Sequence, residues 1–164
     1  MSKFLGTFVL FIVMLNGQDC ALPITPNIGD IIICDNTCDT CNIICDSIKQ
    51  CESIKVYSGA MITNIDCSGE GSCSMAMIYA GNNPPGLPSD NFNRDIYDSV
   101  NINCKGKTSC INMNLYVDGN FINGGILDAD SNGLDSFKEG YLQINILSTQ
   151  IFNLLCGLDI ANCD

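Results

Sequence analysis

The fold of this chain is decided by two stretches, Ile65-Asp-Cys-Ser-Gly-Glu-Gly-Ser-Cys73 and Ile102-Asn-Cys-Lys-Gly-Lys-Thr-Ser-Cys110. Both are versions of one motif, in which five residues separate two cysteines and four more residues separate the second cysteine from an apolar residue followed by tyrosine. A looser version begins at Cys45. Self-similarity at a short period is typical of repeat architectures, in which stacked units bury a shared core. The copies occupy residues 44–57, 65–79 and 102–116 and end on Tyr57, Tyr79 and Tyr116.

The copies alternate apolar and polar residues with period two. Val100-Asn-Ile-Asn-Cys104 and Ile111-Asn-Met-Asn-Leu115 show this pattern most clearly. Side chains alternate across a strand, so each run predicts a strand with one apolar face. In the second and third copies, the residues between the two cysteines are Ser-Gly-Glu-Gly-Ser and Lys-Gly-Lys-Thr-Ser, a composition that favours turns. Each copy therefore predicts strand, tight turn, strand.

The spacing of the copies is interrupted once. The tyrosines of the first and second copies are 22 residues apart, whereas those of the second and third are 37 apart. The additional residues include Gly81-Asn-Asn-Pro-Pro-Gly-Leu-Pro-Ser-Asp90, and such a cluster does not continue a strand. We therefore expect an inserted loop at residues 81–99.

The two closest copies share the corner pattern Cys-x-Gly-x-x-Ser-Cys, at Cys67–Cys73 and Cys104–Cys110. In this respect the chain resembles the small, cysteine-rich, secreted β-solenoids of unicellular eukaryotes, over residues 44–116. The resemblance implies an all-β fold, a short parallel β-helix with disulfide-bridged corners, and no particular activity. A disulfide-rich β-sandwich is the alternative, because three copies are the minimum for a solenoid.

The N-terminal residues predict export. Lys3 is followed by an apolar run from Phe4 to Leu15, which is too short to span a bilayer as a retained anchor. We expect residues 1–17 to be a signal peptide, cleaved after Gly17, and residues 18–164 to form a single cysteine-rich β-repeat domain. The expected location is secreted and extracellular, without a membrane span.

All twelve cysteines follow the predicted cleavage site, and in an oxidising compartment they predict up to six disulfides. The short turn within each copy favours pairing within copies, and a ladder of disulfides between copies is the alternative. Zinc is a weaker alternative for the four cysteines between Cys34 and Cys45, because the chain has no histidine. The within-copy pairs are Cys45 with Cys51, Cys67 with Cys73, and Cys104 with Cys110.

The charge balance excludes some partners. The chain has 18 acidic and 7 basic residues, a net charge of −11. Such a charge repels phosphate backbones and anionic membrane surfaces, so nucleic acid is not an expected partner. The expected partner is an extracellular protein or a glycan.

One stretch has the ligand spacing of an EF-hand calcium loop: Asp128-Ala-Asp-Ser-Asn-Gly-Leu-Asp-Ser-Phe-Lys-Glu139. Oxygen ligands at this spacing wrap one Ca²⁺, with Gly133 at the sharp turn. The preceding residues do not form a helical pattern, so we expect an isolated EF-hand-like loop on a β scaffold, holding a structural Ca²⁺, or else a solvated acidic turn. No other cofactor is required. The predicted ligands are Asp128, Asp130, Asn132, Leu134, Ser136 and Glu139.

The three tyrosines that end the copies would lie in one row on a solenoid, where they either stack on a ligand or stabilise the coils as an aromatic ladder. Enzyme chemistry is not expected, because histidine is absent and paired cysteines are not nucleophiles. The prediction is a secreted, non-catalytic structural or interaction protein of the surface-coat, matrix or effector type, presenting a rigid disulfide-stabilised face. The alternative is a carbohydrate-binding or polysaccharide-cleaving β-helix protein.

Overall fold

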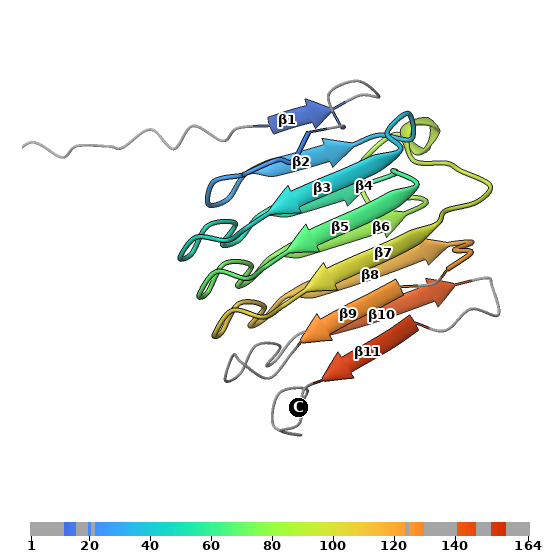
Figure 1. The fold of residues 1–164 in the computed structure, drawn as a ribbon. Helices are drawn as coiled ribbons and strands as arrows, with labels where there is room; N and C mark the ends of the chain where they lie inside the picture. The colour runs from blue at the N-terminus through green and yellow to red at the C-terminus, as the bar shows by residue number, and fades with distance from the viewer. Residues whose placement is uncertain are drawn as a thin grey trace, which may run out of the picture.

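The computed structural model describes residues 12–15, 20, 22–123, 125–129, 141–146 and 152–156. These residues form an all-β structure of two sheets whose strands are all paired in parallel (Figure 1). Among them there is no α-helix, and therefore none long and apolar enough to cross a membrane.

The chain passes from one sheet to the other and back, so that alternate strands belong to the same sheet. Sheet A has the order β1-β2-β4-β6-β8-β10. Its strands are β1 (Ile12–Leu15), β2 (Ile31–Cys34), β4 (Lys55–Ser58), β6 (Met77–Gly81), β8 (Asn114–Gly119) and β10 (Tyr141–Ile146). Sheet B has the order β3-β5-β7-β9-β11, with β3 (Thr40–Ile44), β5 (Ile62–Asp66), β7 (Ser99–Asn103), β9 (Gly125–Ala129) and β11 (Phe152–Cys156). Among the described residues this winding is that of an open β-solenoid rather than of the alternative β-sandwich, because every strand pairing is parallel.

Strand register places the copies one above another. Tyr57 of β4 pairs with Tyr79 of β6, which pairs with Tyr116 of β8. Parallel, in-register pairing aligns equivalent residues in columns that run across the strands. A residue type that recurs at one position of the motif therefore becomes a continuous row on the surface or in the core.

The core lies between the two sheets. Along β5, β7 and β8 buried residues alternate with partly exposed ones, as the period-two pattern predicts. Ile65, Ile102 and Leu115 are among the side chains that are at most 2% exposed. One detail differs from the sequence expectation: strand β8 begins at Asn114, and Ile111 lies in the preceding turn. The backbone of Asn112 has a φ of 56°, which interrupts an extended strand.

The turns that join sheet B to sheet A stack directly on one another at one edge of the solenoid (Figure 1). Backbone hydrogen bonds connect them, because Gly69 N donates to Cys45 O at 3.0 Å and Gly106 N to Cys67 O at 3.3 Å. A Cβ on Gly69 would lie 2.3 Å from Ser47 O. The corner glycine is thus required by the close approach of successive turns.

The inserted loop between β6 and β7 folds back onto the opposite edge of the solenoid. It contains a short 3₁₀ helix, η2 (Ser89–Asn91), and buries Phe92 and Tyr97. The Tyr97 ring stacks on Phe121, with 4.9 Å between ring centroids, and its hydroxyl lies 2.5 Å from Phe92 O. Burial raises the pKa of Tyr97 to about 12, because the phenolate would lose its hydration.

Arg94 fastens this loop to the coil edges. Its Nε donates to Gly59 O at 2.9 Å, and its Nη2 donates to Cys38 O at 2.9 Å and to Asn36 O. One guanidinium thus satisfies carbonyl groups of two different turns, and it links the inserted loop to the β2–β3 and β4–β5 connections.

Candidate functional site

Five disulfides are present among the described residues, and they pair all ten cysteines from Cys20 to Cys110. Three close the corner turns, joining Cys45 to Cys51, Cys67 to Cys73, and Cys104 to Cys110. Because the Cα atoms of each pair are 5.7–5.8 Å apart across one turn, the bridges lie within copies. Disulfides at this density are typical of extracellular proteins.

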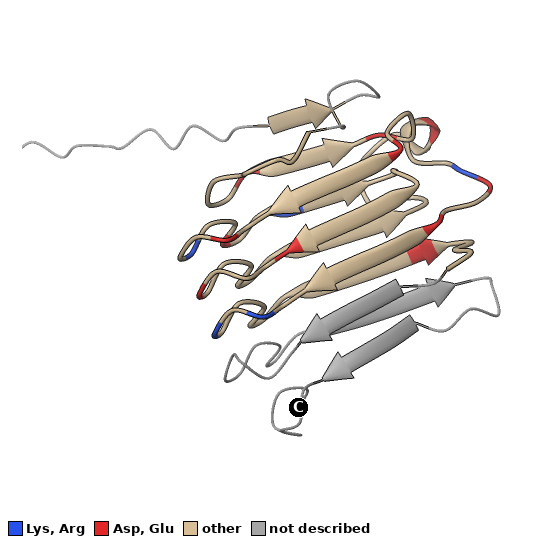
Figure 2. Cartoon of the chain, in the orientation of Figure 1, with Lys and Arg blue, Asp and Glu red and all other residues tan. Residues whose placement is uncertain are grey.

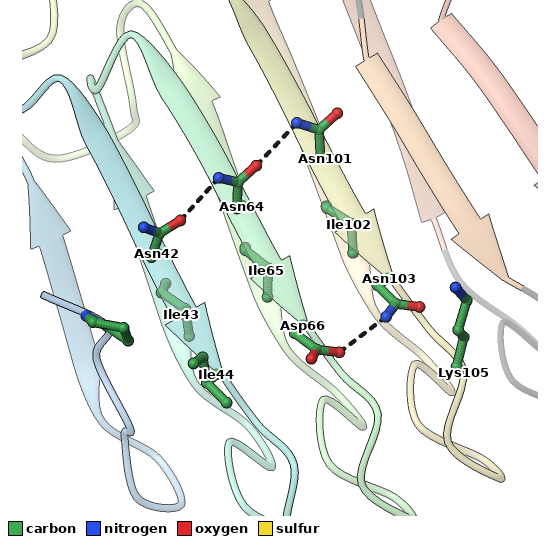
Figure 3. Close-up of a pocket in the computed structure, with 11 residues that line it drawn as sticks. Asn42, Ile43, Ile44, Asn64, Ile65, Asp66, Asn101, Ile102, Asn103 and Lys105 are labelled. Carbon is green, nitrogen blue, oxygen red and sulfur yellow. Dashed lines mark hydrogen bonds between the residues drawn. The ribbon is translucent and has the colours of Figure 1, made fainter. Parts of the chain in front are cut away.

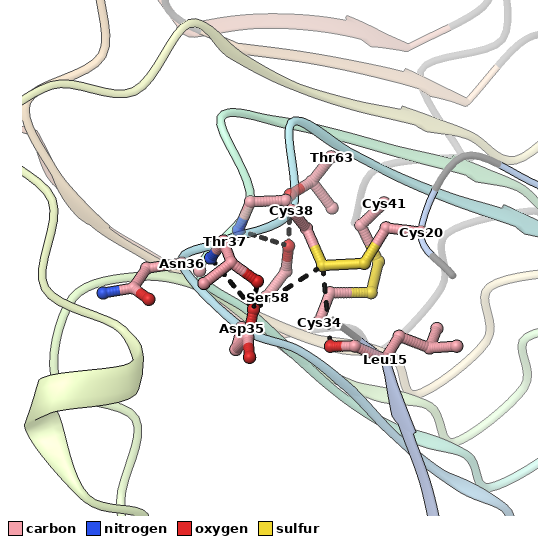
Figure 4. The surroundings of a disulfide bond; sticks show 12 residues. Leu15, Cys20, Cys34, Asp35, Asn36, Thr37, Cys38, Cys41, Ser58 and Thr63 are labelled. Carbon is pink, nitrogen blue, oxygen red and sulfur yellow. Dashed lines mark hydrogen bonds between the residues drawn. A yellow bond between two sulfur atoms is a disulfide. The ribbon is translucent and has the colours of Figure 1, made fainter. Parts of the chain in front are cut away.

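Two further disulfides hold the N-terminal end of the solenoid. Cys20 is joined to Cys38 and Cys34 to Cys41, beside the hydrogen bond between Ser58 Oγ and Thr63 Oγ1 (Figure 4). All four sulfur-bearing residues are at most 1% exposed. Three of the four cysteines for which zinc is the alternative therefore lie in these two bridges, and the fourth, Cys45, is bridged to Cys51.

A hollow of about 560 Å³ lies on the outer face of sheet B (Figure 3). Its floor is the backbone of β3, β5 and β7 at Ile43, Ile65 and Ile102, whose side chains point into the core. Rows of outward-pointing residues border it on both sides, and Pro23 and Lys105 are also in its lining. We call this hollow the sheet B groove. One border is formed by Asn42, Asn64 and Asn101, and the other by Ile44, Asp66 and Asn103.

The first border of the groove is a hydrogen-bonded ladder of side-chain amides. Asn64 Nδ2 donates to Asn42 Oδ1 at 2.8 Å, and Asn101 Nδ2 donates to Asn64 Oδ1 at 2.9 Å. On the second border, Asn103 Nδ2 donates to Asp66 Oδ1 at 3.0 Å. Because parallel strands lie about 4.8 Å apart, these contacts repeat from coil to coil and hold the amides in one orientation.

The ladder keeps hydrogen-bonding capacity for a ligand. An amide side chain has two N–H donors and two acceptor lone pairs, and the ladder uses one of each at its central member, Asn64. The groove therefore offers alternating donors and acceptors along the solenoid axis. Among the described residues that line it, Asp66 is the one carboxylate and Lys105 the one cation.

Charge is distributed away from the faces of the strands. In the described part of the chain, most acidic and basic residues lie in the turns and in the inserted loop, and the strand faces are largely uncharged (Figure 2). The sheet B groove is thus a mainly uncharged surface within an acidic protein, and it combines apolar lining atoms with rows of polar side chains. Such a surface is suited to hydrogen bonding with uncharged groups rather than to binding a polyanion.

The predicted tyrosine row lies on the outer face of sheet A. The rings of Tyr57 and Tyr79 are stacked at 5.3 Å between centroids, and those of Tyr79 and Tyr116 at 4.6 Å. The interplanar angles are 6° and 7°, so both faces of Tyr79 are covered by its neighbours. Burial and the neighbouring tyrosines raise the pKa of Tyr79. A sugar ring stacks on a free ring face, and Tyr79 has no free face. The geometry of the row is therefore that of an aromatic ladder.

The predicted calcium loop lies mostly outside the described residues. Asp128 belongs to β9 and pairs in register with Asn103, whose Oδ1 is buried and has no hydrogen-bond partner among the described residues. The other predicted ligands are not described: Asp130, Asn132, Leu134, Ser136 and Glu139. In the part of the chain that is described, no three metal-ligating side chains are grouped together.

The amide ladder was not anticipated from the sequence, although its signal is present there. Asn42, Asn64 and Asn101 each stand three positions before the first cysteine of a copy, and an isoleucine follows each of them. A polar residue fixed at one position of a stacked motif becomes a row, so this recurrence was sufficient to find it.

No known protein family, curated protein or solved structure matches this chain.

Proposed function

We propose that this chain is a secreted, non-catalytic interaction protein and that the sheet B groove is its binding face. The observation that carries the proposal is the amide ladder of Asn42, Asn64 and Asn101, held at 2.8 and 2.9 Å. Ordering a row of donors and acceptors on a mobile surface costs conformational entropy. In this protein the side-chain hydrogen bonds already hold the row in one arrangement without a ligand.

Rigidity supports a binding role. Disulfides close the corner turn at the end of each of the three strands under the groove. A surface that is already ordered loses little conformational entropy on association, so more of the contact energy remains as affinity. The same rigidity suits a coat, matrix or effector component.

Several features support a role without catalysis. The chain contains no histidine, so it lacks the general base most often used in acid–base chemistry. Cleavage of glycosides ordinarily requires two carboxyl groups that flank one bond. Asp66, the one carboxylate among the described groove residues, is engaged by Asn103.

A second candidate, carbohydrate binding, is favoured by the largely uncharged lining of the groove and by its row of amide groups. Sugar hydroxyl groups donate and accept hydrogen bonds, and so do the amide N–H groups and oxygen lone pairs that the ladder leaves unused. The groove runs across the strands, so a ligand extended along the solenoid axis would meet the three asparagines in turn. Among ligands, the groove therefore best fits an uncharged, extended oligosaccharide.

A glycan array followed by calorimetry tests this candidate. We expect the wild-type protein to bind one or more neutral oligosaccharides, and Asn64→Ala to weaken that binding by roughly tenfold or more, the equivalent of about 1.4 kcal/mol. Asn114→Ala is the matched control, because Asn114 points outward from sheet A. Its affinity should equal that of the wild type.

Two outcomes would contradict the candidate. Absence of neutral-glycan binding by the folded protein would remove carbohydrate recognition and leave the interaction role to a protein partner. Binding that survives Asn64→Ala but is lost in Tyr79→Ala would move the site from the sheet B groove to the tyrosine row.

A further inference from the structure

The N-terminal edge of sheet A is covered by a strand from the predicted signal peptide. Strand β1 pairs in parallel with β2, with Ile12 opposite Ile31 and Leu15 opposite Cys34 (Figure 1). Asp35 N lies 3.5 Å from Leu15 O, which extends the pairing by one residue. The edge of β2 therefore accepts an extended segment in a defined register.

Side chains along β1 divide into two sets. Ile12 and Met14 are 58% and 66% exposed, whereas Val13 and Leu15 are partly buried. Leu15 packs against the core cluster, close to the disulfide between Cys20 and Cys38 (Figure 4). The edge thus requires apolar side chains at two alternate positions and places little demand on the others.

Cleavage after Gly17 would remove β1 and leave β2 as the edge strand of sheet A. This step rests on the proposed secretion of the chain. The uncovered strand, Ile-Ile-Ile-Cys, contains Ile32 and Cys34, which are fully buried while β1 is in place. Unpaired N–H and C=O groups beside apolar side chains form a template for pairing with another chain.

The neighbouring edge of sheet B stays covered after cleavage. Ile24 forms a parallel bridge to Ile43, with Ile24 N donating to Asn42 O at 2.9 Å and Ile44 N to Ile24 O at 2.8 Å. The Cys20–Cys38 disulfide attaches this segment to the solenoid. The edge of sheet A therefore has room for one strand of a partner. A second copy that stacked a whole coil here would collide with the segment around Ile24.

We propose that the mature protein binds a partner by strand addition, taking an extended apolar segment in parallel along β2. The segment carries aliphatic side chains at two alternate positions, which occupy the places of Val13 and Leu15. Its main chain supplies hydrogen bonds along the edge, and its two partly buried side chains supply specificity, as in other cases of β-augmentation. This surface is separate from the sheet B groove, which lies on the other sheet.

A synthetic peptide with the sequence of residues 11–16 and a short lysine tail is a direct probe. We expect it to bind the protein that begins at residue 18, measured by fluorescence anisotropy, and to slow amide hydrogen exchange in residues 31–34. Protein that retains residues 1–17 is the matched control, because its own β1 occupies the edge and the peptide should not bind.

Peptide variants test the side-chain pattern. Leu15→Asp should weaken binding at least about tenfold, since it places a charge where a partly buried apolar side chain packs against the core. Met14→Thr should bind within about twofold of the parent peptide, because that position is exposed.

Three results would overturn the proposal. The first is a folded protein starting at residue 18 that does not bind the parent peptide. The second is equal binding of the Leu15→Asp and Met14→Thr peptides, which would indicate non-specific adhesion. The third is an exported protein whose N-terminal sequence still includes residues 12–15, because β1 would then close the edge permanently. None of these results affects glycan binding by the groove, so failure of the two proposals is distinguishable.

Discussion

Substitution of the corner glycine is the sharpest test of how the coils stack. In Gly106→Ala, the new Cβ would lie 2.2 Å from Gly69 O, 2.6 Å from Gly69 C and 2.7 Å from Ser68 O. In real proteins a Cβ atom essentially never lies within 3.0 Å of a non-bonded heavy atom. The opposing atoms belong to backbone, so no side-chain rotation relieves the overlap, and the two turns must move apart.

The magnitude follows from two opposed effects. Overpacking in a well-packed region costs about 1–3 kcal/mol, and here the strain falls on hydrogen-bonded turns. Replacing glycine by alanine also restricts the unfolded chain, which stabilises the folded state by about 0.4–1 kcal/mol. We therefore expect a net loss of about 1.3 kcal/mol in the free energy of unfolding. For a chain of this size the melting temperature should fall by about 3–5 °C.

Thermal unfolding followed by far-ultraviolet circular dichroism measures this loss, with a thiol assay to show that the disulfides are intact. Ser47→Ala is the matched control, because Ser47 occupies the same corner position in the first copy and already carries a Cβ. Its melting temperature should change little, since exposed substitutions usually alter stability by less than about 0.5 kcal/mol. Melting of Gly106→Ala within 1 °C or so of the wild type, or an equal loss in Ser47→Ala, would refute the stacking argument.

Three further predictions concern the inserted loop, alkaline stability and calcium. Arg94→Lys should lower the free energy of unfolding by roughly 2 kcal/mol, because one ammonium does not replace a guanidinium bound to three carbonyls. Proteolysis within residues 82–98 should also become faster. Unchanged cleavage would contradict this prediction. The pKa of Tyr97 is about 12 in the folded state against 10.0 ordinarily, so its contribution to stability is complete below about pH 10 and is lost as the pH rises through 12. Urea midpoints should therefore fall across this window, and less steeply in Tyr97→Phe; parallel slopes would assign the fall to other groups. Millimolar Ca²⁺ at ten times its Kd should stabilise chelator-treated protein by roughly 1.4 kcal/mol, and Glu139→Gln should remove most of this; equal melting with Ca²⁺ and with chelator would reduce residues 128–139 to an acidic turn.

Much of the fold follows from local pattern. The period-two alternation at Val100, Ile102 and Cys104 predicts a strand with one buried face, and all three residues are at most 1% exposed. The Pro and Gly cluster predicts an inserted loop, which lies between β6 and β7 at residues 82–98. These features are readable because the strand period and turn chemistry depend on residues that are close in sequence.

The site was harder to predict because it depends on register. The sequence places Asn64 three positions before Cys67 and Asn101 three before Cys104, but 37 residues separate the two asparagines. Only the parallel pairing of β5 with β7 brings their amides into hydrogen-bonding contact. The tyrosine row was predicted to lie in register, but whether its ring faces are free or covered depends on side-chain rotation, which no sequence pattern specifies.

The sequence by itself determined the class of structure: strands of period two, tight cysteine-bounded turns, and repetition at a spacing that a solenoid coil accommodates. The tertiary structure decided which surfaces are available to bind a ligand or partner. It covered the tyrosine faces by stacking, aligned the asparagines into a ladder along a groove, and set β1 against the edge of β2. The physical reason is one of range, because alternation and turn propensity act over a few residues, whereas columns, grooves and sheet edges arise from contacts between coils.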